Sequence, residues 1–424
     1  MRTLSTVSTI TLPRHRPDSR YAMLRLFVTL LIMTVGSCGM YVVSVVLPAI
    51  QSDFGVARAE ASLPYTLLMI GFGFGGIVMG KLADRYGVMW PLLLGAVCVG
   101  IGFVASSFAK SIVAFSVVQG LFVGLGSGAV FAPLVADTSL WFVKRRGMAV
   151  AVCASGNYLA GAVWPPIVQK FVEASGWRST YVGLGLFCGL AMAGLALFMR
   201  TRPPAAVMDA APPAAAGHAG VDMAARPFGF SLGMAQGLLC VAGTACCIAM
   251  AMPQVHIVAY CTDLGFGAAR GAQMLSLMLA CGIVSRLVSG AICDRIGGLR
   301  TLLLGSVLQC VALFMFLPFD GMVPLFVVSA MFGLFQGGIV PSYAIIVREY
   351  FPPAEASARV GTVIGCTLLG MALGGWMSGK VFDLTGSYHA AFINGIAWNL
   401  VNMSIAVMLL LRTRRLHGAV PAVA

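Results

Sequence analysis

Long apolar stretches are the feature of this 424-residue chain that most limits its possible folds. We identify twelve, most of them about 20 to 27 residues long, the length at which an α-helix crosses about 30 Å of hydrocarbon. The chain is 59% hydrophobic and 10% charged, with a mean hydropathy of +0.93. We therefore predict an all-α, multi-pass membrane protein. The predicted spans are 24–49, 61–82, 88–108, 111–137, 147–170, 179–199, 229–259, 268–292, 299–318, 322–347, 358–382 and 388–411.

A Pro/Ala-rich segment without apolar periodicity, residues 200–228, separates six spans from six. Such a composition is typical of a flexible linker. We therefore expect two six-helix bundles with a tail at each end. The predicted divisions are an N-terminal tail 1–21, a bundle 22–199, the linker 200–228, a second bundle 229–412 and a C-terminal tail 413–424.

The two halves repeat one pattern at an offset near 210 residues. The sequence GKLADRYG of the first half aligns with GAICDRIG of the second, and Trp141-Phe142 aligns with Tyr350-Phe351. Agreement at several places indicates a duplication and hence two pseudo-symmetric bundles. The repeated loop residues are Gly80, Asp84, Arg85 and Gly87 in the first copy and Gly290, Asp294, Arg295 and Gly297 in the second.

The basic residues predict the orientation of the chain. Of the 27 Lys and Arg residues, twenty fall on the side of the N-terminus, six on the other side, and one, Arg286, inside a span. Cytoplasmic loops carry the excess, so we expect both termini in the cytoplasm and the protein in the cell (inner) membrane. Dispersal over short loops explains the net charge of +13 without nucleic-acid binding. The six are Arg58, Lys110, Lys170, Arg178, Arg270 and Lys380.

Arg286 is the charge that the membrane fold does not explain. It lies eight residues before Asp294 and thus about 12 Å from the helix end, near the middle of the bilayer. At the offset of 210 its counterpart is Gly76, so the charge breaks the internal repeat. A charge at this depth costs about 3 kcal/mol on insertion scales, and a guanidinium does not lose its proton to escape.

A buried arginine calls for an anionic partner, and all fourteen acidic residues fall in predicted loops, tails or span ends. One interpretation is that the missing anion is the substrate, a small organic anion whose carboxylate takes a two-pronged hydrogen bond from the guanidinium. The alternative is that Arg286 extends toward the cytoplasm or bonds to backbone carbonyls between helices. Protein groups that satisfied all its nitrogens would remove this argument for a substrate.

The repeated loops GKLADRYG and GAICDRIG resemble the signature loop of the major facilitator superfamily, which lies between spans 2 and 3 and between spans 8 and 9. Together with six plus six spans and a long central loop, the resemblance covers nearly the whole chain. It implies the major facilitator fold, a secondary transporter, and loops that steady one of two alternating-access states. The first copy ends in Val88-Met89-Trp90 where the family usually has a basic pair, which weakens this latch.

The sequence SRLVSGAICDRIG, with Arg286 four residues before Gly290, resembles the monocarboxylate porter and oxalate:formate antiporter branch, in which this arginine binds substrate. The segment around Trp141 to Gly147 also resembles that branch. Two departures matter. The animal porters carry a proton-coupling aspartate where this chain has Gly282, and the oxalate exchangers carry a lysine inside span 11, where only Lys380 occurs, at the far end. The absent second cation favours a monoanion.

Five further side chains are candidate ligands. Asn157 and Gln336 lie near mid-depth and could bond a carboxylate, although such groups also join helices to one another. Tyr41 and Tyr65 could close the cavity from the extracellular half with their hydroxyls, with interface packing as the alternative. His256 is the one histidine inside a predicted span and could sense protons, or simply be hydrogen-bonded.

Three function classes compete. We favour transport of small organic anions, with a coupling proton or an exchanged anion left open, over efflux of drugs or cations. Span 5 reads SGNYLAGAVWPP and lacks the glycine motif of the efflux branch, and no acid inside a span awaits a cation. A membrane enzyme would need a nucleophile with its base or a metal cluster, and the span ends carry neither. We expect no enzymatic activity, no cofactor and no bound metal; the lipid bilayer is the other partner.

Overall fold

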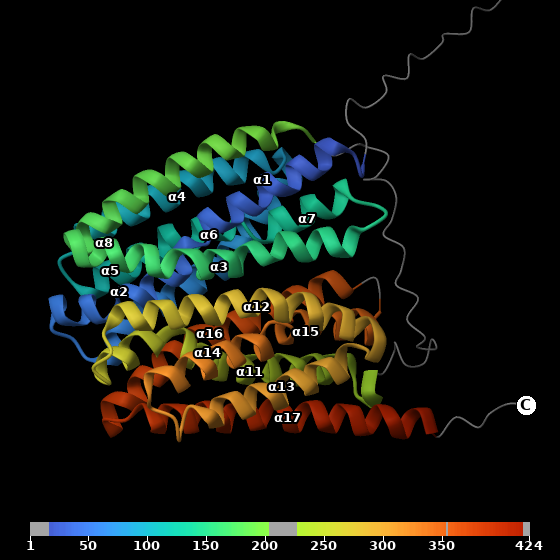
Figure 1. Cartoon of the computed structure of the whole chain (residues 1–424). Helices are drawn as coiled ribbons and strands as arrows, with labels where there is room; N and C mark the ends of the chain where they lie inside the picture. The colour runs from blue at the N-terminus through green and yellow to red at the C-terminus, as the bar shows by residue number, and fades with distance from the viewer. Residues whose placement is uncertain (1–16, 203–226, 353–354, 419–424) are drawn as a thin grey trace, which may run out of the picture.

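The structure, a computed structural model, describes residues 17–202, 227–352 and 355–418, and the regular elements of these residues are helices (Figure 1). The predicted linker falls largely on 203–226 and the N-terminal tail on 1–16, outside the described residues. The long α-helices of the N-terminal half are α1 Arg20–Gly36, α2 Cys38–Phe54, α3 Arg58–Tyr86, α4 Met89–Ser107, α7 Ala132–Trp141 and α8 Arg146–Leu197. Its shorter pieces are α5 Ile112–Val118, the π-helix η1 Gln119–Gly124, α6 Leu125–Gly128 and the 3-10 turn η2 Phe198–Arg200. The C-terminal half comprises η3 Pro227–Gly229, α11 Leu232–Asp263, α12 Ala268–Ile296, α13 Gly298–Met315, α14 Met322–Gln336, α15 Ile339–Tyr350, α16 Ala356–Thr385 and α17 Tyr388–Gly418.

Within the described residues the twelve predicted spans are confirmed. Eleven helices are long and apolar enough to cross a membrane, and one of these, Gly147–Arg200, is 54 residues long. It turns back on itself at Gly176, whose φ of 79° and ψ of 162° are not helical. Glycine adopts this conformation without the steric cost that a Cβ would bring. Spans 5 and 6 are therefore the two arms of α8.

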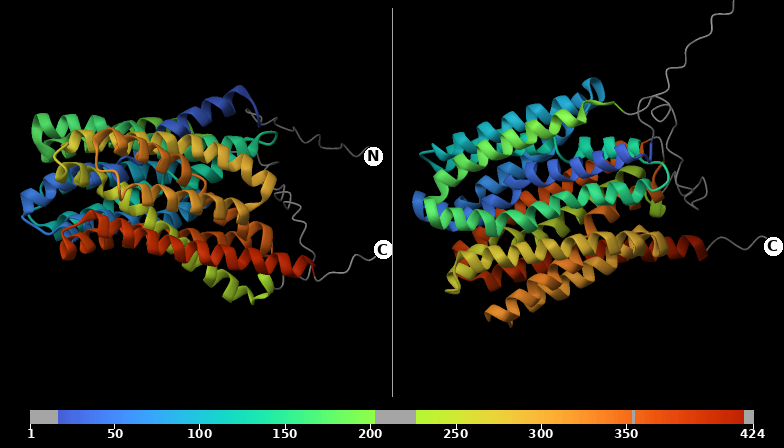
Figure 2. Two further views of the ribbon diagram at one scale, coloured as in Figure 1. Left: turned by 60° about the horizontal axis from the view of Figure 1, so that its bottom comes forward. Right: turned by 45° about the horizontal axis from the view of Figure 1, so that its top comes forward.

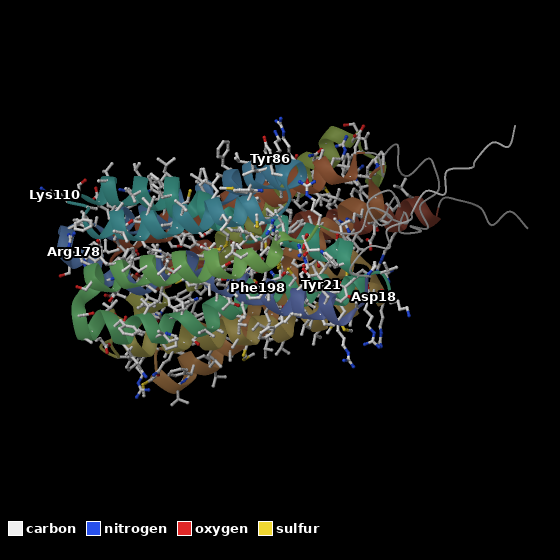
Figure 3. The ribbon with its side chains drawn as sticks, turned by 90° about the horizontal axis from the view of Figure 1, so that it is seen from above. Asp18, Tyr21, Tyr86, Lys110, Arg178 and Phe198 are labelled. Carbon is white, nitrogen blue, oxygen red and sulfur yellow. The ribbon has the colours of Figure 1, made fainter. Side chains whose placement is uncertain are left out.

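The helices form two groups, α1–α8 and α11–α17, which lie one above the other in Figure 1 and run roughly parallel. The start of α1 and the end of α17 lie at the same end of the molecule in both views of Figure 2. We call this the linker end. Asp18 marks it in Figure 3, while Lys110 and Arg178 mark the opposite end. α17 continues through Gly418, so the predicted C-terminal tail, 413–424, starts within this helix.

Three predicted spans are broken rather than continuous. Span 1 breaks at Ser37, between α1 and α2; span 4 breaks between α6 and α7; span 10 breaks between α14 and α15. The last two breaks have one cause. In a regular helix the carbonyl of Ala129 would accept from residue 133 and that of Gly337 from residue 341, but both donors are prolines without an N–H. The pair Pro133 and Pro341 repeats at nearly the predicted offset.

The two halves meet along two seams, α3 with α16 and α8 with α12. On the first seam, the Thr66 hydroxyl donates to the Ala372 carbonyl at 2.9 Å, and a Cβ on Gly379 would lie 2.9 Å from the Cα of Ala59. On the second seam, the Ser276 hydroxyl donates to the Ala162 carbonyl.

Toward the linker end, glycines of both seams face open space. A Cβ on Gly80 of α3 or on Gly290 of α12 would meet no atom within 4 Å. The contacts between the halves named above lie at the opposite end and in the middle of the bundle.

Candidate functional site

Arg286 lies in the linker-side half of the 29-residue helix α12 and is half-buried where the two halves meet. Its Nη1 donates to the Ala154 carbonyl of α8 at 2.9 Å, and its Nε makes a long contact of 3.5 Å with the Gly337 carbonyl. Its Cζ lies 4.4 Å from the ring centre of Tyr158, also on α8. The arginine thus contacts both halves of the molecule.

These contacts offset the cost of burial but do not neutralise the charge. Burial of an arginine at mid-membrane costs about 3 kcal/mol. A desolvated cation–π contact stabilises by roughly 2 kcal/mol, and a hydrogen bond from a charged group by roughly 1.5 to 3 kcal/mol. In the part of the chain that the structure describes, no carboxylate lies within 4 Å of the guanidinium. Arg286 is therefore a half-buried cation that has no acidic partner among the described residues, at the interface of the two halves.

The sequence left open the alternative that Arg286 bonds to backbone carbonyls. This is the case for Nη1 and, through a long contact, for Nε. The alternative does not describe the whole group. Among the described residues Nη2 has no hydrogen-bond acceptor. One prong of the guanidinium is left for a ligand.

The broken helix explains the Gly337 contact. Pro341 removes the N–H that would pair with the Gly337 carbonyl, so this carbonyl is open to Arg286. The Gly337 N–H is in turn bound by the Ser285 hydroxyl at 3.0 Å. Discontinuous helices that expose backbone groups at mid-depth are a usual construction for binding sites in transporters.

Tyr158 is a neighbour of Arg286 that the sequence did not single out. Its ring packs against Gly282, where a Cβ would lie 2.6 Å from its Cε1. Gly282 is one turn before Arg286, so the aromatic ring fills the space that a side chain at residue 282 would need. The ring is 7% exposed, and its hydroxyl has no hydrogen-bond partner among the described residues. No spacing rule joins Tyr158 to Gly282, because they belong to different halves.

Asn157 and Tyr41 form one unit in the N-terminal half. The Tyr41 hydroxyl donates to Oδ1 of Asn157 at 2.6 Å, and Nδ2 of Asn157 lies 3.4 Å from the Ser37 hydroxyl, at the break of span 1. Both side chains are buried. Their hydrogen bonds join α2 to α8, as the interhelical alternative supposed. Asn157 immediately precedes Tyr158, whose ring lies against Arg286.

Gln336 is fully buried at the end of α14 and is incompletely satisfied. Its Oε1 accepts from Nε2 of Gln254 on α11 at 2.9 Å. Its own Nε2 is buried with no hydrogen-bond partner among the described residues. An amide donor in this condition costs free energy unless a ligand or water meets it. Gln336 immediately precedes Gly337, whose carbonyl contacts Arg286.

Tyr65 and His256 lie away from Arg286, toward the opposite end. The Tyr65 ring packs against Gly375 across the first seam, at 3.0 Å from a Cβ placed there. His256 is fully buried, with Nε2 2.8 Å from the Gly375 carbonyl and Nδ1 3.3 Å from the Tyr388 hydroxyl. Both ring nitrogens therefore have partners within the protein.

A second buried arginine, Arg58, joins the halves at the opposite end. The sequence analysis counted it as a loop cation, whereas it begins α3 and is buried. Its Nη2 lies 3.1 Å from a carboxylate oxygen of Asp263, and its Nη1 donates to the Tyr388 hydroxyl at 2.8 Å. The N–H groups of Arg58 and Ala59 donate to the Asp383 carboxylate at 2.9 and 2.8 Å. We call Arg58, Asp263, Asp383 and Tyr388 the Arg58 cluster.

The last glycine of each repeated loop has a positive φ and ends the preceding helix. Gly87 and Gly297 follow α3 and α12 with φ of 88° and 83°. Neither Asp84 with Arg85 nor Asp294 with Arg295 makes an ion pair within 4 Å in the described residues. The N-terminus of α13 is capped instead by Glu349, whose carboxylate accepts from the Gly298 N–H at 3.1 Å. The role of the loops in steadying one state stays a prediction.

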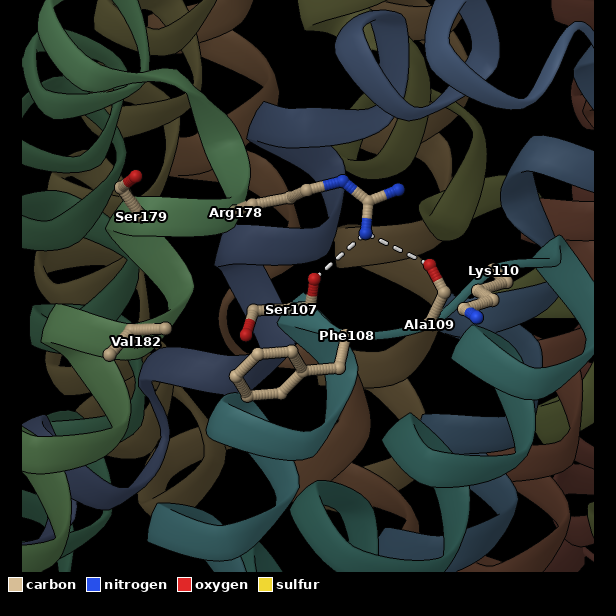
Figure 4. A pocket seen from close by; sticks show the side chains of 7 residues that line it. All are labelled: Ser107, Phe108, Ala109, Lys110, Arg178, Ser179 and Val182. Atoms are coloured by element: carbon tan, nitrogen blue, oxygen red, sulfur yellow. Dashed lines mark hydrogen bonds between the residues drawn. The ribbon is translucent and has the colours of Figure 1, made fainter.

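A hollow of about 620 Å³ lies at the opposite end, outside the candidate site (Figure 4). Two charged residues line it, Lys110 and Arg178, and the arginine is already engaged. Nη1 donates to the carbonyls of Ser107 and Ala109, and Nη2 pairs with Asp53 at 2.9 Å. This arginine holds the N-terminal half together, and we assign the hollow no binding role.

Comparison with known proteins shows the family and the fold of the chain. The sequence model of the Major Facilitator Superfamily matches residues 29–322 and 237–423. Monocarboxylate transporter 13 of Rattus norvegicus is 25% identical over 346 residues, covering 79% of this chain and 76% of that protein. Monocarboxylate transporter 11 of Homo sapiens is 28% identical over 338 residues, covering 74% and 67%.

Among solved structures, the fold is similar to that of a bacterial homologue of the human lysosomal transporter Spinster in an inward-facing and occupied conformation. The TM-score is 0.71 at 14% sequence identity, covering 94% of this chain and 98% of that one. The predicted fold is thus confirmed, and the protein is a multi-pass membrane protein. The chain belongs to the major facilitator superfamily, and within it resembles the monocarboxylate porters.

Proposed function

We propose that the protein is a secondary transporter that moves small organic anions, monocarboxylates above all, by alternating access. Arg286 binds the substrate carboxylate. The single observation that carries the proposal is a guanidinium at the centre of the molecule with no carboxylate within 4 Å among the described residues.

The chemistry of the site favours one carboxylate. A guanidinium presents a planar fork that matches a carboxylate, and Nη2 has no acceptor of its own in the described chain. The unpartnered Nε2 of Gln336 supplies a second donor, which suits a hydroxyl or a second oxygen. Lys380 is exposed in the last two turns of α16, on the first seam, whereas Arg286 lies on the second, so Lys380 does not supply a second buried cation for a dianion.

The contacts between the halves support alternating access. They join the halves at the opposite end through the Arg58 cluster and in the middle through Arg286, while Gly80 and Gly290 are free of neighbours toward the linker end. We take the linker end as cytoplasmic, because it carries most of the Lys and Arg residues, and the membrane as the cell membrane. The state described is then closed to the outside.

The test is uptake of a radiolabelled monocarboxylate by proteoliposomes. Arg286→Ala should abolish uptake while the protein stays folded, and Arg286→Lys should impair it, because a point charge lacks the fork. Arg270→Ala is the matched control, since Arg270 is an exposed arginine of the same helix bonded to Gln273. Full transport by Arg286→Ala would refute the binding role. Binding of lipophilic cations without any binding of carboxylates would favour drug or cation efflux instead.

A further inference from the structure

We infer that Tyr158 is a positioning residue that holds Arg286 while no substrate is bound, so that the empty carrier can change state and net transport does not require an exchanged anion. This inference rests on the proposed function. The inference deepens it in two ways. Tyr158 is the neutral group that contacts Arg286 when no substrate is bound, and the mode of transport is net movement and not obligatory exchange.

The contact joins the two halves at the site itself. Arg286 belongs to α12 of the C-terminal half, and both of its α8 partners, the Ala154 carbonyl and the Tyr158 ring, belong to the N-terminal half. Along this seam the close contacts run from Ser276 with Ala162, through Gly282 with Tyr158, to Arg286 with Ala154. Beyond them, a Cβ on Gly290 would meet nothing within 4 Å. Of these contacts, that of Arg286 with Ala154 lies nearest the linker end.

The physical problem of an empty carrier is a lone guanidinium in a closed, poorly hydrated centre. If the arginine has no partner when substrate is absent, closing the empty carrier around the bare charge costs too much free energy. Such a carrier changes state only when substrate is bound. Here the charged face of the guanidinium lies on the Tyr158 ring, and Nη1 lies on a carbonyl. Both partners are neutral, so they stabilise the group without cancelling the charge that attracts the next anion.

Gly282 fixes the ring in this position. A Cβ at residue 282 would lie 2.6 and 2.7 Å from two ring carbons of Tyr158, closer than side chains pack. The absence of a side chain at Gly282 is therefore what lets the ring lie beneath the guanidinium one turn later. An acid at residue 282 would neutralise Arg286, whereas the ring leaves it charged.

The experiment separates net movement from exchange. Wild type, Tyr158→Phe and Tyr158→Leu are reconstituted, and two rates are measured with one radiolabelled monocarboxylate: efflux into substrate-free buffer and exchange at equal concentrations on both sides. Efflux requires the empty carrier to return, and exchange does not. Tyr158→Leu should slow efflux by about tenfold, which corresponds to about 1.4 kcal/mol and lies between an exposed and a desolvated cation–π contact. Exchange should stay within about twofold, since the loaded carrier supplies its own anion.

Tyr158→Phe keeps the ring and should keep wild-type efflux. Two results would overturn the inference. One is an equal loss of efflux and exchange in Tyr158→Leu. The other is a loss in Tyr158→Phe as large as in Tyr158→Leu, which would show that the hydroxyl acts on substrate directly. The retained exchange also shows that each variant is folded. Wild-type protein that moves no monocarboxylate would refute the proposed function itself, and the inference with it.

A second variant reaches the ring from the other side of the contact. Gly282→Ala should displace the Tyr158 ring and reproduce the selective loss of efflux. Gly194→Ala is the control, because Gly194 lies in the second arm of α8, beyond the turn at Gly176, and a Cβ there meets nothing within 4 Å. Normal efflux in Gly282→Ala alongside a slow Tyr158→Leu would count against the proposed geometry.

Discussion

Tyr158 and Gly282 face each other across the two halves so closely that a side chain at residue 282 would displace the tyrosine ring. The contact joins two residues that lie far apart in the sequence. One is Gly282, one turn before Arg286, and the other is the aromatic Tyr158 of span 5. The ring occupies the volume that an acid would need. The charge of the site therefore depends on which of the two groups is present.

Replacement of the Tyr158 ring by an acid at residue 282 should make substrate uptake depend on pH. Gly282→Asp alone should fold poorly, because its Cβ meets the Tyr158 ring. Combined with Tyr158→Ala, the aspartate lies four residues before Arg286 and can pair with it. Ionised at high pH, it competes with the substrate; protonated at low pH, it releases the guanidinium.

We therefore expect uptake by the double variant, divided by that of wild type, to rise as the pH falls through the pKa of the aspartate. The ratio removes the effect of pH on the substrate. A ratio that is flat or falls toward acid would contradict an ion pair between residues 282 and 286. Tyr158→Ala alone is the control for loss of the ring.

Loss of the Arg58 cluster should open the end of the molecule opposite to the linker. Arg58→Gln removes the contacts of the guanidinium with Asp263 and Tyr388, and the Asp263 side chain is 35% exposed, so part of the energy of the pair is already screened. We expect a cysteine at position 66, whose native hydroxyl bonds Ala372 across the seam, to react about tenfold faster with a membrane-impermeant maleimide.

The matched control for this opening is Arg178→Gln. Arg178 lies at the same end, but its partners Ser107, Ala109 and Asp53 all belong to its own half. It should leave the reactivity at position 66 unchanged. Equal reactivity in both variants, or none in either, would show that the Arg58 cluster does not hold the halves together.

The buried amide of Gln336 allows ligand binding and stability to be separated. Gln336→Leu leaves Nε2 of Gln254 without its partner, so the melting temperature should fall, whereas Gln254→Leu combined with Gln336→Leu removes both amides and should restore it. If Gln336 donates to the substrate, the KM for uptake stays raised by about tenfold in both variants. Recovery of the KM together with stability would reduce Gln336 to a packing role.

Arg25 and Asp137 should matter for folding and not for substrate. Arg25 donates to both carboxylate oxygens of Asp137, at 2.9 and 3.0 Å, and both side chains are buried within the N-terminal half. Removal of one partner of such a pair costs about 3 to 5 kcal/mol. Arg25→Ala should lower the melting temperature strongly, and Arg25→Met with Asp137→Leu should recover most of it. The KM of the folded fraction should equal that of wild type throughout.

The sequence alone determined the membrane fold, because a hydrocarbon bilayer allows few solutions for an apolar chain. Twelve spans, their duplication and the depth of Arg286 below Asp294 follow from apolar length and from the rise of a helix, which are local quantities. The breaks at Pro133 and Pro341 also have a local cause, but a hydropathy pattern does not register a missing N–H, so the predicted spans ran through them.

Only the tertiary structure decided which groups surround the charges. Arg58 lies between two predicted spans, yet its guanidinium and its backbone N–H together bond to three side chains of the other half. Arg286 contacts the ring of Tyr158 and the carbonyl of Ala154. These partners are set by how two six-helix halves dock, and docking pairs residues from distant parts of the chain through shape and solvation. Helical periodicity fixes which face a residue occupies, but the partner of that face is chosen in three dimensions.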